Sequence, residues 1–335
     1  MTKPPQVTVV MSVYNTASFL RESIESILAQ TFTDFEFLII DDCSTDSSRE
    51  IIRSYSDPRI RLFCNDKNLA LIKSLNKGLQ LARGDYIARH DSDDISLPLR
   101  LEKEVQFLEA NKNVGLLGSY FIAINEAGDF LQYFRPPTDS DTLRRKLLVK
   151  NSFAHGTVMF RKECIEKVGC FREELKHCED YDLWLRVSQF FELANLPFYL
   201  YKWRLNINSV SLANKHIQDR NVQLTIRLHQ ERLSLGMDQI QRGEFDAKKW
   251  FKSTTDDLRK KAIAVRAYHF QGSCFLLNDH HKKALEYYLK SLKLDKLNPK
   301  TWFLIFFALI KIVIPKSLLS FFFHIFSRLQ PKVNF

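Results

Sequence analysis

Three acidic clusters, far apart in the chain, carry the residues best suited to chemistry. They are Asp41-Asp42, Asp91-Ser92-Asp93-Asp94 and Glu179-Asp180. The first two follow apolar runs typical of buried strands, and the carboxyl ends of strands form the ligand-binding edge of an α/β sheet. Because clustered aspartates repel one another, such a site needs a cation, and a hard divalent ion with oxygen ligands, Mg²⁺ or Mn²⁺, is the natural partner. The combination predicts a site for a metal-held nucleotide diphosphate.

Alternating strands and helices are expected to position these clusters. Apolar runs predict strands over residues 7–13, 35–40, 59–63 and 86–88, and helices that end near residues 28, 55 and 82 separate them. This alternation indicates βαβ units and a largely parallel sheet. The same domain is expected to continue with helices over 99–111 and 181–189, a strand over 114–124, a short extended segment over 158–160 and a strand over 198–203.

Taken together, the motifs resemble those of the family 2 glycosyltransferases. The resemblance runs from about residue 7 to residue 211. Its motifs occur in the family's order: Val13-Tyr14-Asn15, Gln30-Thr31-Phe32, Asp41 to Asp46, Asn76-Lys77-Gly78, Gly84 to Arg89, Asp91 to Asp94, His155 with Val158 to Arg161, and Glu179 to Trp184. Each motif alone is weak, but the ordered set is specific. The resemblance implies a GT-A fold, an α/β, Rossmann-like and mostly parallel sheet flanked by helices, followed here by a C-terminal helical region.

The same resemblance assigns the nucleotide-sugar and metal sites. It implies that Asp42 binds the uracil ring of a UDP-sugar, with Ser12 and Tyr14 alongside the base. Asp93 would ligate the Mn²⁺ or Mg²⁺ ion that bridges the two phosphates, and Asp91 would face the ribose or the ion. From the residues alone, Asp42 could instead be a turn or helix N-terminal residue, and the Asp-x-Asp could be a solvated acidic loop.

The third cluster matches the position of the family's catalytic base. Asp180 would remove the proton of the acceptor hydroxyl in an inverting transfer, although it could also simply cap the following helix. Glu179 is adjacent, and two neighbouring carboxylates can raise the pKa of one of them. His155 is expected to line the acceptor pocket, with a packed core histidine as the alternative, and Trp184 is grouped with it. Arg204 stands where many members have a histidine, and it could pair with a diphosphate.

Composition adds expectations about location. The net charge is +10, but residues 1–200 carry −4 and residues 201–335 carry +14. A basic C-terminal part could face nucleic acid, anionic lipid or a phosphorylated substrate. The N-terminus does not resemble a signal peptide, and the six cysteines form no Cys-x-x-Cys pair or zinc spacing. Reduced thiols in a cytoplasmic protein are therefore expected.

The predicted organisation has three parts. Residues 1–213 form the GT-A domain, and residues 214–300 form a basic helical region that contains one tetratricopeptide-like hairpin or an ordinary helical hairpin. Residues 301–335 form a Phe-rich amphipathic tail. Its uncharged runs are shorter than the roughly 20 residues of a spanning helix. The tail is expected to lie in the membrane interface, with spanning and burial against the catalytic domain as alternatives.

The sequence therefore predicts an inverting, UDP-sugar-dependent glycosyltransferase. The family's processive Gln-x-x-Arg-Trp motif is absent, so transfer is expected to be non-processive. The expected acceptor is a hydroxyl of a lipid-linked saccharide in bacterial lipopolysaccharide, O-antigen or capsule synthesis. The enzyme would be peripheral on the inner face of the cell membrane, with no nucleic-acid partner. Two alternatives remain: a nucleotidyltransferase, which usually has a Gly-rich phosphate loop that is missing here, and a non-catalytic scaffold.

Overall fold

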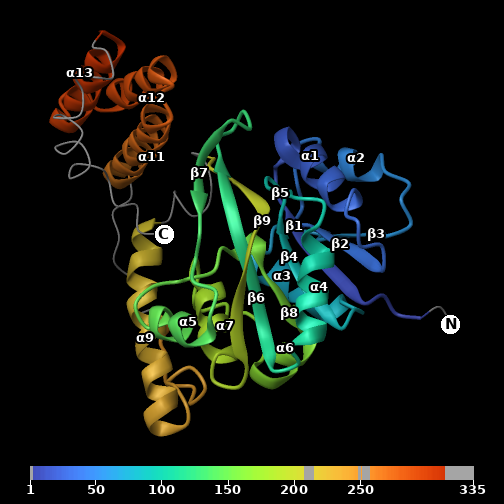
Figure 1. Ribbon diagram of the computed structural model, residues 1–335. Coiled ribbons are helices and arrows are strands. Elements are labelled where there is room, and N and C mark those ends of the chain that lie inside the picture. The colour runs from blue at the N-terminus through green and yellow to red at the C-terminus, as the bar shows by residue number, and fades with distance from the viewer. Residues whose placement is uncertain (1–2, 207–214, 248–249, 251–256, 314–335) are drawn as a thin grey trace. The chain divides into compact units, whose positions relative to one another are not determined.

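The computed structural model describes residues 3–206, 215–247, 250 and 257–313, and the structural statements below concern these residues (Figure 1). The chain divides into two compact units. Unit 1 comprises residues 1–124, 133–204 and 216–245, and unit 2 comprises residues 125–132, 205–215 and 246–335. Each unit is described by itself.

Unit 1 is built on a mixed sheet whose described strands follow the order β3-β2-β1-β4-β8-β6-β9-β5, with β7 paired to β6. Strand β1 runs parallel to β2 and β4, β2 runs parallel to β3, and β6 runs parallel to β9. Strand β8 is antiparallel to β4 and β6, and β5 is antiparallel to β9. The strands are β1 Val7–Val13, β2 Phe35–Asp41, β3 Ile60–Cys64, β4 Tyr86–Asp91, β5 Ile95–Ser96, β6 Val114–Ile124, β7 Phe130–Phe134, β8 Met159–Arg161 and β9 Glu192–Arg204.

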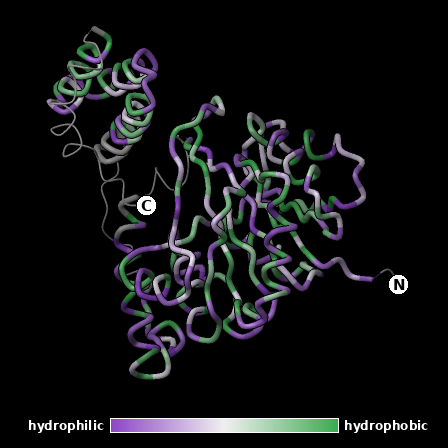
Figure 2. Tube along the Cα trace, viewed as in Figure 1, coloured by the Kyte–Doolittle hydropathy of each residue, from purple (hydrophilic) through white to green (hydrophobic). Residues whose placement is uncertain are grey.

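Helices cover both faces of this sheet. They are α1 Ala17–Leu28, α2 Ser48–Arg53, α3 Leu71–Leu81, α4 Arg100–Ala110, α5 Ser140–Leu147, α6 Lys162–Val168, α7 Glu179–Val187 and α9 Lys215–Leu235, with a 3₁₀ turn, η1, at His155–Thr157. Every residue of β1 and β2 is buried, because both faces of these strands are covered (Figure 2). Alternate residues of β1 pack into two clusters, one with α1 and α4 and the other with α3, α5 and α7.

The fold class predicted from sequence is confirmed, as are the main strands and helices that lead to the acidic clusters. The prediction missed β5, β7, α5 and α6, and it started the last strand at residue 198, whereas β9 begins at Glu192. Helix α9 belongs to unit 1, because Asn221 bonds to the Lys176 carbonyl and the Thr225 hydroxyl donates to the Cys178 sulfur near the start of α7. The sequence-based division placed this helix with those that follow it.

Unit 2 includes the helices α11 Asp257–Leu277, α12 His281–Leu294 and α13 Pro299–Val313. Gly272 of α11 allows a close approach to α12, since a Cβ at this position would lie 2.5 Å from the Tyr288 ring. The predicted helical hairpin is therefore formed, and its tetratricopeptide character stays a prediction. Most of the predicted tail, residues 314–335, lies outside the described residues. None of the described helices combines the length and the apolar character needed to cross a membrane.

Candidate active site

The carboxyl ends of three parallel strands meet at one edge of the sheet. The register pairs Val13 of β1 with Asp41 of β2, and Ser12 of β1 with Asp91 of β4. The first two acidic clusters therefore lie at the same edge, where α/β sheets bind ligands. Ser12 is buried at this edge, whereas the Tyr14 side chain is exposed just beyond it.

Asp41 and Asp42 are neighbours with different partners. Asp42 is buried, and its Oδ1 accepts hydrogen bonds from the Asn65 side chain and the Leu69 backbone N–H, both at 2.8 Å. These two donors fix the Asp42 carboxylate at the end of β2. Asp41 is buried too, but its Oδ2 pairs with Arg49 of α2 at 2.7 Å. Asp41 therefore fastens the following helix, and Asp42 is the member of the pair available for a ligand role.

Asn15 ties the loop after β1 to the loop after β2. Its side-chain oxygen accepts from the backbone N–H groups of Thr45, at 2.8 Å, and Asp46, at 3.3 Å. The backbone N–H of Asn15 donates to the Ser44 hydroxyl at 3.1 Å. Asn15 has φ +54°, a left-handed conformation that asparagine tolerates better than most residues. The two loops beside Asp42 are therefore joined into one wall.

Two buried arginines hold the Asp-x-Asp loop. Arg89 pairs with Asp91 at 2.5 Å. The Arg204 backbone N–H donates to Asp94 Oδ1 at 2.7 Å, and its Nε donates to the Asp93 carbonyl at 2.8 Å. Both arginine side chains are buried, and their contacts fix the conformation of this loop.

The guanidinium of Arg204 makes two further contacts. It pairs with Glu22 of α1 at 2.5 Å, and it lies 4.9 Å from the centre of the Phe19 ring. These contacts make Arg204 a brace between α1 and the Asp-x-Asp loop. Its pairing with a donor diphosphate stays a prediction.

The acidic loop has the character of a cation site. Burial raises the pKa of Asp93 to about 6, and the negative charge of Asp91 adds to this effect. Burial also raises the pKa of Asp94, with contributions from Asp93 and Asp91. A bound cation would relieve this repulsion, and an all-oxygen donor set fits Mg²⁺ or Mn²⁺. Within the described residues no group of three or more His, Cys, Asp or Glu could hold a metal, so a substrate and water would supply the other ligands, as is common for Mg²⁺.

The third acidic cluster opens α7 and approaches the second. Asp180 Oδ2 accepts from the Asn151 side chain at 3.0 Å, and its Oδ1 accepts from the Tyr181 N–H at 2.7 Å. Burial raises the pKa of Asp180, and the charge of Asp91 raises it further. Glu179 is buried with no partner for its Oε2, and burial followed by the Asp180 charge raises its pKa. A carboxylate with a raised pKa is a stronger base than a solvated one.

His155 and Trp184 form the apolar floor of this region. Burial lowers the pKa of His155 to about 3, so the imidazole is neutral, and its Nε2 has no hydrogen-bond partner. The ring stands edge-on to Trp184 and Phe171, at centroid distances of 6.1 and 5.6 Å. Trp184 is fully buried. Because the Trp184 side chain is buried, it could affect acceptor binding only indirectly, through its contact with His155.

Comparison with known proteins identifies the family of this chain. The family profile described as Glycosyl transferase family 2 matches residues 8–169. The chain is 31% identical over 241 residues to the amylovoran biosynthesis glycosyltransferase AmsE of Erwinia amylovora, which covers 70% of this chain and 89% of AmsE. The chain belongs to glycosyltransferase family 2. This assignment makes it a transferase and sets aside the nucleotidyltransferase and scaffold alternatives.

Further comparisons extend the family 2 assignment. The O-antigen biosynthesis glycosyltransferase WbnJ of Escherichia coli is 36% identical over 188 residues, 54% of this chain and 71% of WbnJ. The crystal structure of S. aureus TarS 1-349 in complex with UDP-GlcNAc matches with a TM-score of 0.54 at 16% identity, over 87% of this chain and 88% of TarS 1-349. The mannosyltransferase PcManGT from Pyrobaculum calidifontis, in complex with GDP-Man and Mn²⁺, matches with a TM-score of 0.50 at 16% identity, over 92% of this chain and 86% of PcManGT. At these identities the structures support the GT-A fold alone.

Three contacts around these carboxylates were not predicted from the sequence. Arg89 pairs with Asp91, Asn151 donates to Asp180, and the Tyr201 hydroxyl accepts from the Asp91 N–H at 3.2 Å. Arg89 had one available signal, a charged residue within the otherwise apolar strand that leads to the Asp-x-Asp. The other two come from a loop and a distant strand and carry no local pattern.

Proposed function

We propose that this glycosyltransferase transfers a sugar from a UDP-sugar to a hydroxyl of a saccharide acceptor, with inversion at the anomeric carbon and one transfer per encounter. The observation that carries the proposal is the approach of Asp180 to Asp91, since the charge of Asp91 contributes to raising the pKa of Asp180. A candidate base therefore faces the candidate donor site across a short gap. The TarS complexes with UDP and UDP-GlcNAc support the choice of uridine nucleotide.

In the proposed reaction Asp180 takes the proton of the acceptor hydroxyl. The acceptor oxygen forms a bond to the anomeric carbon as the bond from that carbon to the diphosphate oxygen breaks, and the nucleotide leaves with the electron pair. Asp42 accepts a hydrogen bond from the uracil N–H, in the wall formed by Ser12 and Tyr14. Asp93 and Asp91 would hold Mn²⁺ or Mg²⁺, which when bound stabilises negative charge on the leaving diphosphate. The PcManGT complex with Mn²⁺ supports this choice of ion.

We extend the proposal to the acceptor and its location. WbnJ is named for O-antigen biosynthesis and AmsE for amylovoran biosynthesis, which supports a role in bacterial surface polysaccharide assembly. A lipid-linked saccharide is the proposed acceptor, and the proposed location is the cytoplasmic face of the cell membrane. The +14 net charge of residues 201–335 favours an anionic surface.

Two substitutions separate the proposed roles. Asp93→Asn should abolish metal-dependent UDP binding measured by calorimetry. Asp180→Asn should leave UDP binding nearly unchanged and lower turnover by roughly 10²-fold or more, the usual contribution of a positioned base. Asp85→Asn is the matched control, because Asp85 is an exposed aspartate just before the opposite end of β4.

The outcomes are distinct. Unchanged turnover in Asp180→Asn would exclude it as the base, and collapse of UDP binding in that variant would move Asp180 into the nucleotide site. Full activity in excess chelator would contradict the metal assignment.

A further inference from the structure

Helix α13 exposes an apolar face instead of a polar one. Trp302, Phe303, Phe306, Leu309 and Ile312 are each between 37% and 62% exposed, and their spacing places them on one side of the helix. We call these five residues the apolar ridge. A surface helix of a globular protein normally turns such residues inward and exposes charged ones. A contiguous exposed apolar strip of this kind marks an interaction surface.

The lysine in the last turn of this helix is buried, whereas Lys300 in its first turn is exposed. Lys311 is 8% exposed, and its ammonium lies 3.5 Å from the Leu276 carbonyl of α11. Beyond its first turn, α13 therefore buries its lysine and exposes a row of apolar side chains, the reverse of an ordinary surface helix. The ridge carries no charge at all, so a highly charged protein partner would find nothing to pair with along it.

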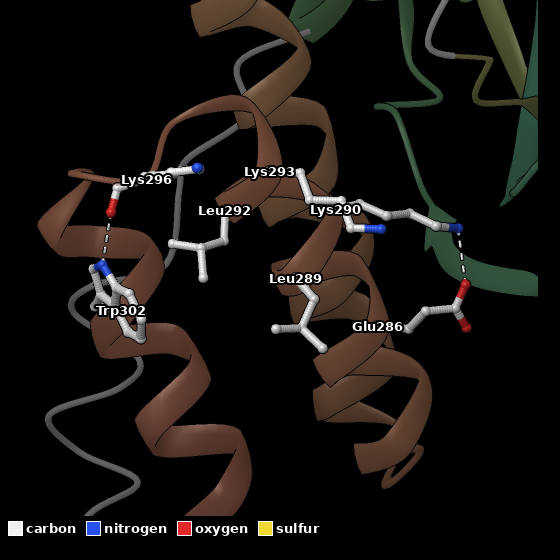
Figure 3. Close-up of a pocket in the computed structure, with 7 residues that line it drawn as sticks. All are labelled: Glu286, Leu289, Lys290, Leu292, Lys293, Lys296 and Trp302. Atoms are coloured by element: carbon white, nitrogen blue, oxygen red, sulfur yellow. Dashed lines mark hydrogen bonds and ion pairs between the residues drawn. The ribbon is translucent and has the colours of Figure 1, made fainter.

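A basic pocket adjoins the ridge. It has a volume of about 590 Å³, and Figure 3 shows its lining. The lining residues are Glu286, Leu289, Lys290, Leu292, Lys293, Lys296 and Trp302. Glu286 pairs with Lys290 at 2.8 Å, which leaves Lys293 and Lys296 as exposed ammonium groups without a neighbouring carboxylate in the pocket.

Trp302 belongs to both the pocket and the ridge. Its Nε1 donates to the Lys296 carbonyl at 2.8 Å, which fixes the indole at the boundary between the two (Figure 3). Tryptophan is the side chain that favours the boundary between headgroups and acyl chains. The sequence beyond Asp295 contains no acidic residue, so nothing in that stretch opposes an anionic surface.

We propose that the apolar ridge and the basic pocket together form a docking surface for an anionic phospholipid bilayer. The ridge enters the acyl boundary, and Lys293 and Lys296 contact lipid phosphates. The exposed apolar residues run along one side of α13, so the helix would lie along the membrane with this side in the acyl boundary. The inference rests on the peripheral location in the proposed function and names the surface responsible.

The test uses the full chain and vesicle flotation. Wild-type protein should float with vesicles of phosphatidylcholine and phosphatidylglycerol, and float less with phosphatidylcholine alone. Phe306→Glu should lower the partition coefficient by about tenfold or more, because a carboxylate in the ridge must be desolvated and repelled by the anionic surface. The matched control is Phe190→Glu, since Phe190 is an equally exposed phenylalanine of unit 1.

The lysines are tested separately. The double variant Lys293→Glu, Lys296→Glu should lose about tenfold or more of its affinity for anionic vesicles and little for neutral ones. Lys282→Glu, an exposed lysine at the start of α12 and outside the pocket, should have a much smaller effect. Brominated lipid should quench part of the tryptophan fluorescence in wild type, and that part should vanish in Trp302→Phe.

Other outcomes would overturn the proposal. Flotation of Phe306→Glu equal to wild type would show that the ridge does not meet the bilayer. If flotation is unchanged and Phe306→Glu lowers the melting temperature, residues of the same chain cover the ridge. If the variant instead converts a dimer to a monomer in light scattering, a second copy covers it. Hydrolysis of UDP-sugar in solution should be unaffected by Phe306→Glu, so failure of docking and failure of the proposed catalysis are distinguishable.

Discussion

At the scale of single residues, adjacent and chemically identical groups have different tasks. Asp41 pairs with Arg49, whereas Asp42 is held by Asn65 and the Leu69 N–H at the sheet edge. Residue type, position and burial do not distinguish the two roles, because Asp41 and Asp42 are adjacent aspartates and both are buried. The contacts of each carboxylate separate them.

The hydrogen bond from Asn151 to Asp180 predicts a shift in pH dependence. Asn151 stabilises the ionised form of Asp180, so Asn151→Ala should raise its pKa further. A base is active only when ionised, so activity falls as the pH falls through its pKa, and a higher pKa moves that loss to higher pH. The charge of Asp91 from β4 opposes Asn151 and raises the pKa of Asp180, and the charge of Asp180 raises the pKa of the adjacent Glu179.

The measurement is the acidic limb of kcat/KM between pH 5 and pH 8. This limb should shift to higher pH in Asn151→Ala, so that the variant loses more activity near pH 6 than near pH 8. Ser152→Ala is the control, because the neighbouring Ser152 hydroxyl makes no hydrogen bond to Asp180. An acidic limb at the same pH as in wild type, or at lower pH, would contradict the role given to Asn151.

The acidic clusters of the site could be predicted because each stands beside a pattern that sequence displays. Asp91 and Asp93 follow an apolar strand, and their family motif is ordered with the others. Asn151 and Arg89 could not be assigned roles in this way. The role of Asn151 depends on packing, which brings Asp180 of α7 to it. Arg89 pairs with Asp91 two residues further along β4, and the sequence does not show which partner this arginine takes.

At the scale of elements, a buried charge network joins α7 to the segment after α9. Asp182 of α7 pairs with Arg186 at 2.8 Å, and Asp238 pairs with Arg232 at 2.5 Å and Arg172 at 2.8 Å. Arg172 and Arg232 also approach Asp182, at 3.5 and 3.7 Å. The helix that presents Asp180 is therefore anchored from outside the matched family profile.

Removal of one carboxylate from this network should destabilise unit 1. Asp238→Asn leaves two largely buried guanidinium groups with only their longer contacts to Asp182, and breaking a buried pair costs up to about 3–5 kcal/mol. Chemical denaturation should show this loss. Glu244→Gln, which removes an exposed ion pair with Arg242, is the control and should change stability little. Equal stability of the two variants would mean that the network contributes nothing net.

The longest apolar runs were predicted correctly, whereas short strands that depend on a partner were missed, as was α5 despite its capping Asp139. The apolar runs of β1 and β2 display their burial directly. The first residues of β9 join the sheet because they pair with β6, and β5 exists only through two residues that pair with β9. Such strands depend on their partner, so their own sequences do not reveal them.

At the scale of the whole molecule, the chain has two compact units, and α9 belongs to the catalytic one. Leu224, Leu228 and Thr225 of this helix are buried. The change from acidic to basic composition suggested a boundary at residue 213, because net charge was the visible difference between the parts. The net charge of a segment depends on its exposed side chains and does not indicate which element its apolar face packs against.

Two truncations should therefore differ. A chain ending at residue 245 should keep a cooperative unfolding transition and should be stabilised by UDP, because ligand binding to the folded state raises its melting temperature. A chain ending at residue 213 lacks α9 and Asp238, so it should aggregate or melt at a much lower temperature. Differential scanning fluorimetry with and without UDP makes the comparison. Equal behaviour of both chains would restore the boundary predicted from sequence.

The contacts of Asn15 have a thermodynamic consequence for the proposed donor site. Because this one side chain joins the loops after β1 and β2, the walls beside Asp42 are ordered before any ligand arrives. A preorganised wall loses little conformational entropy when a nucleotide enters. Affinity for the uridine part should then arise with a small entropic penalty and fast association, since no loop must first find its bound conformation.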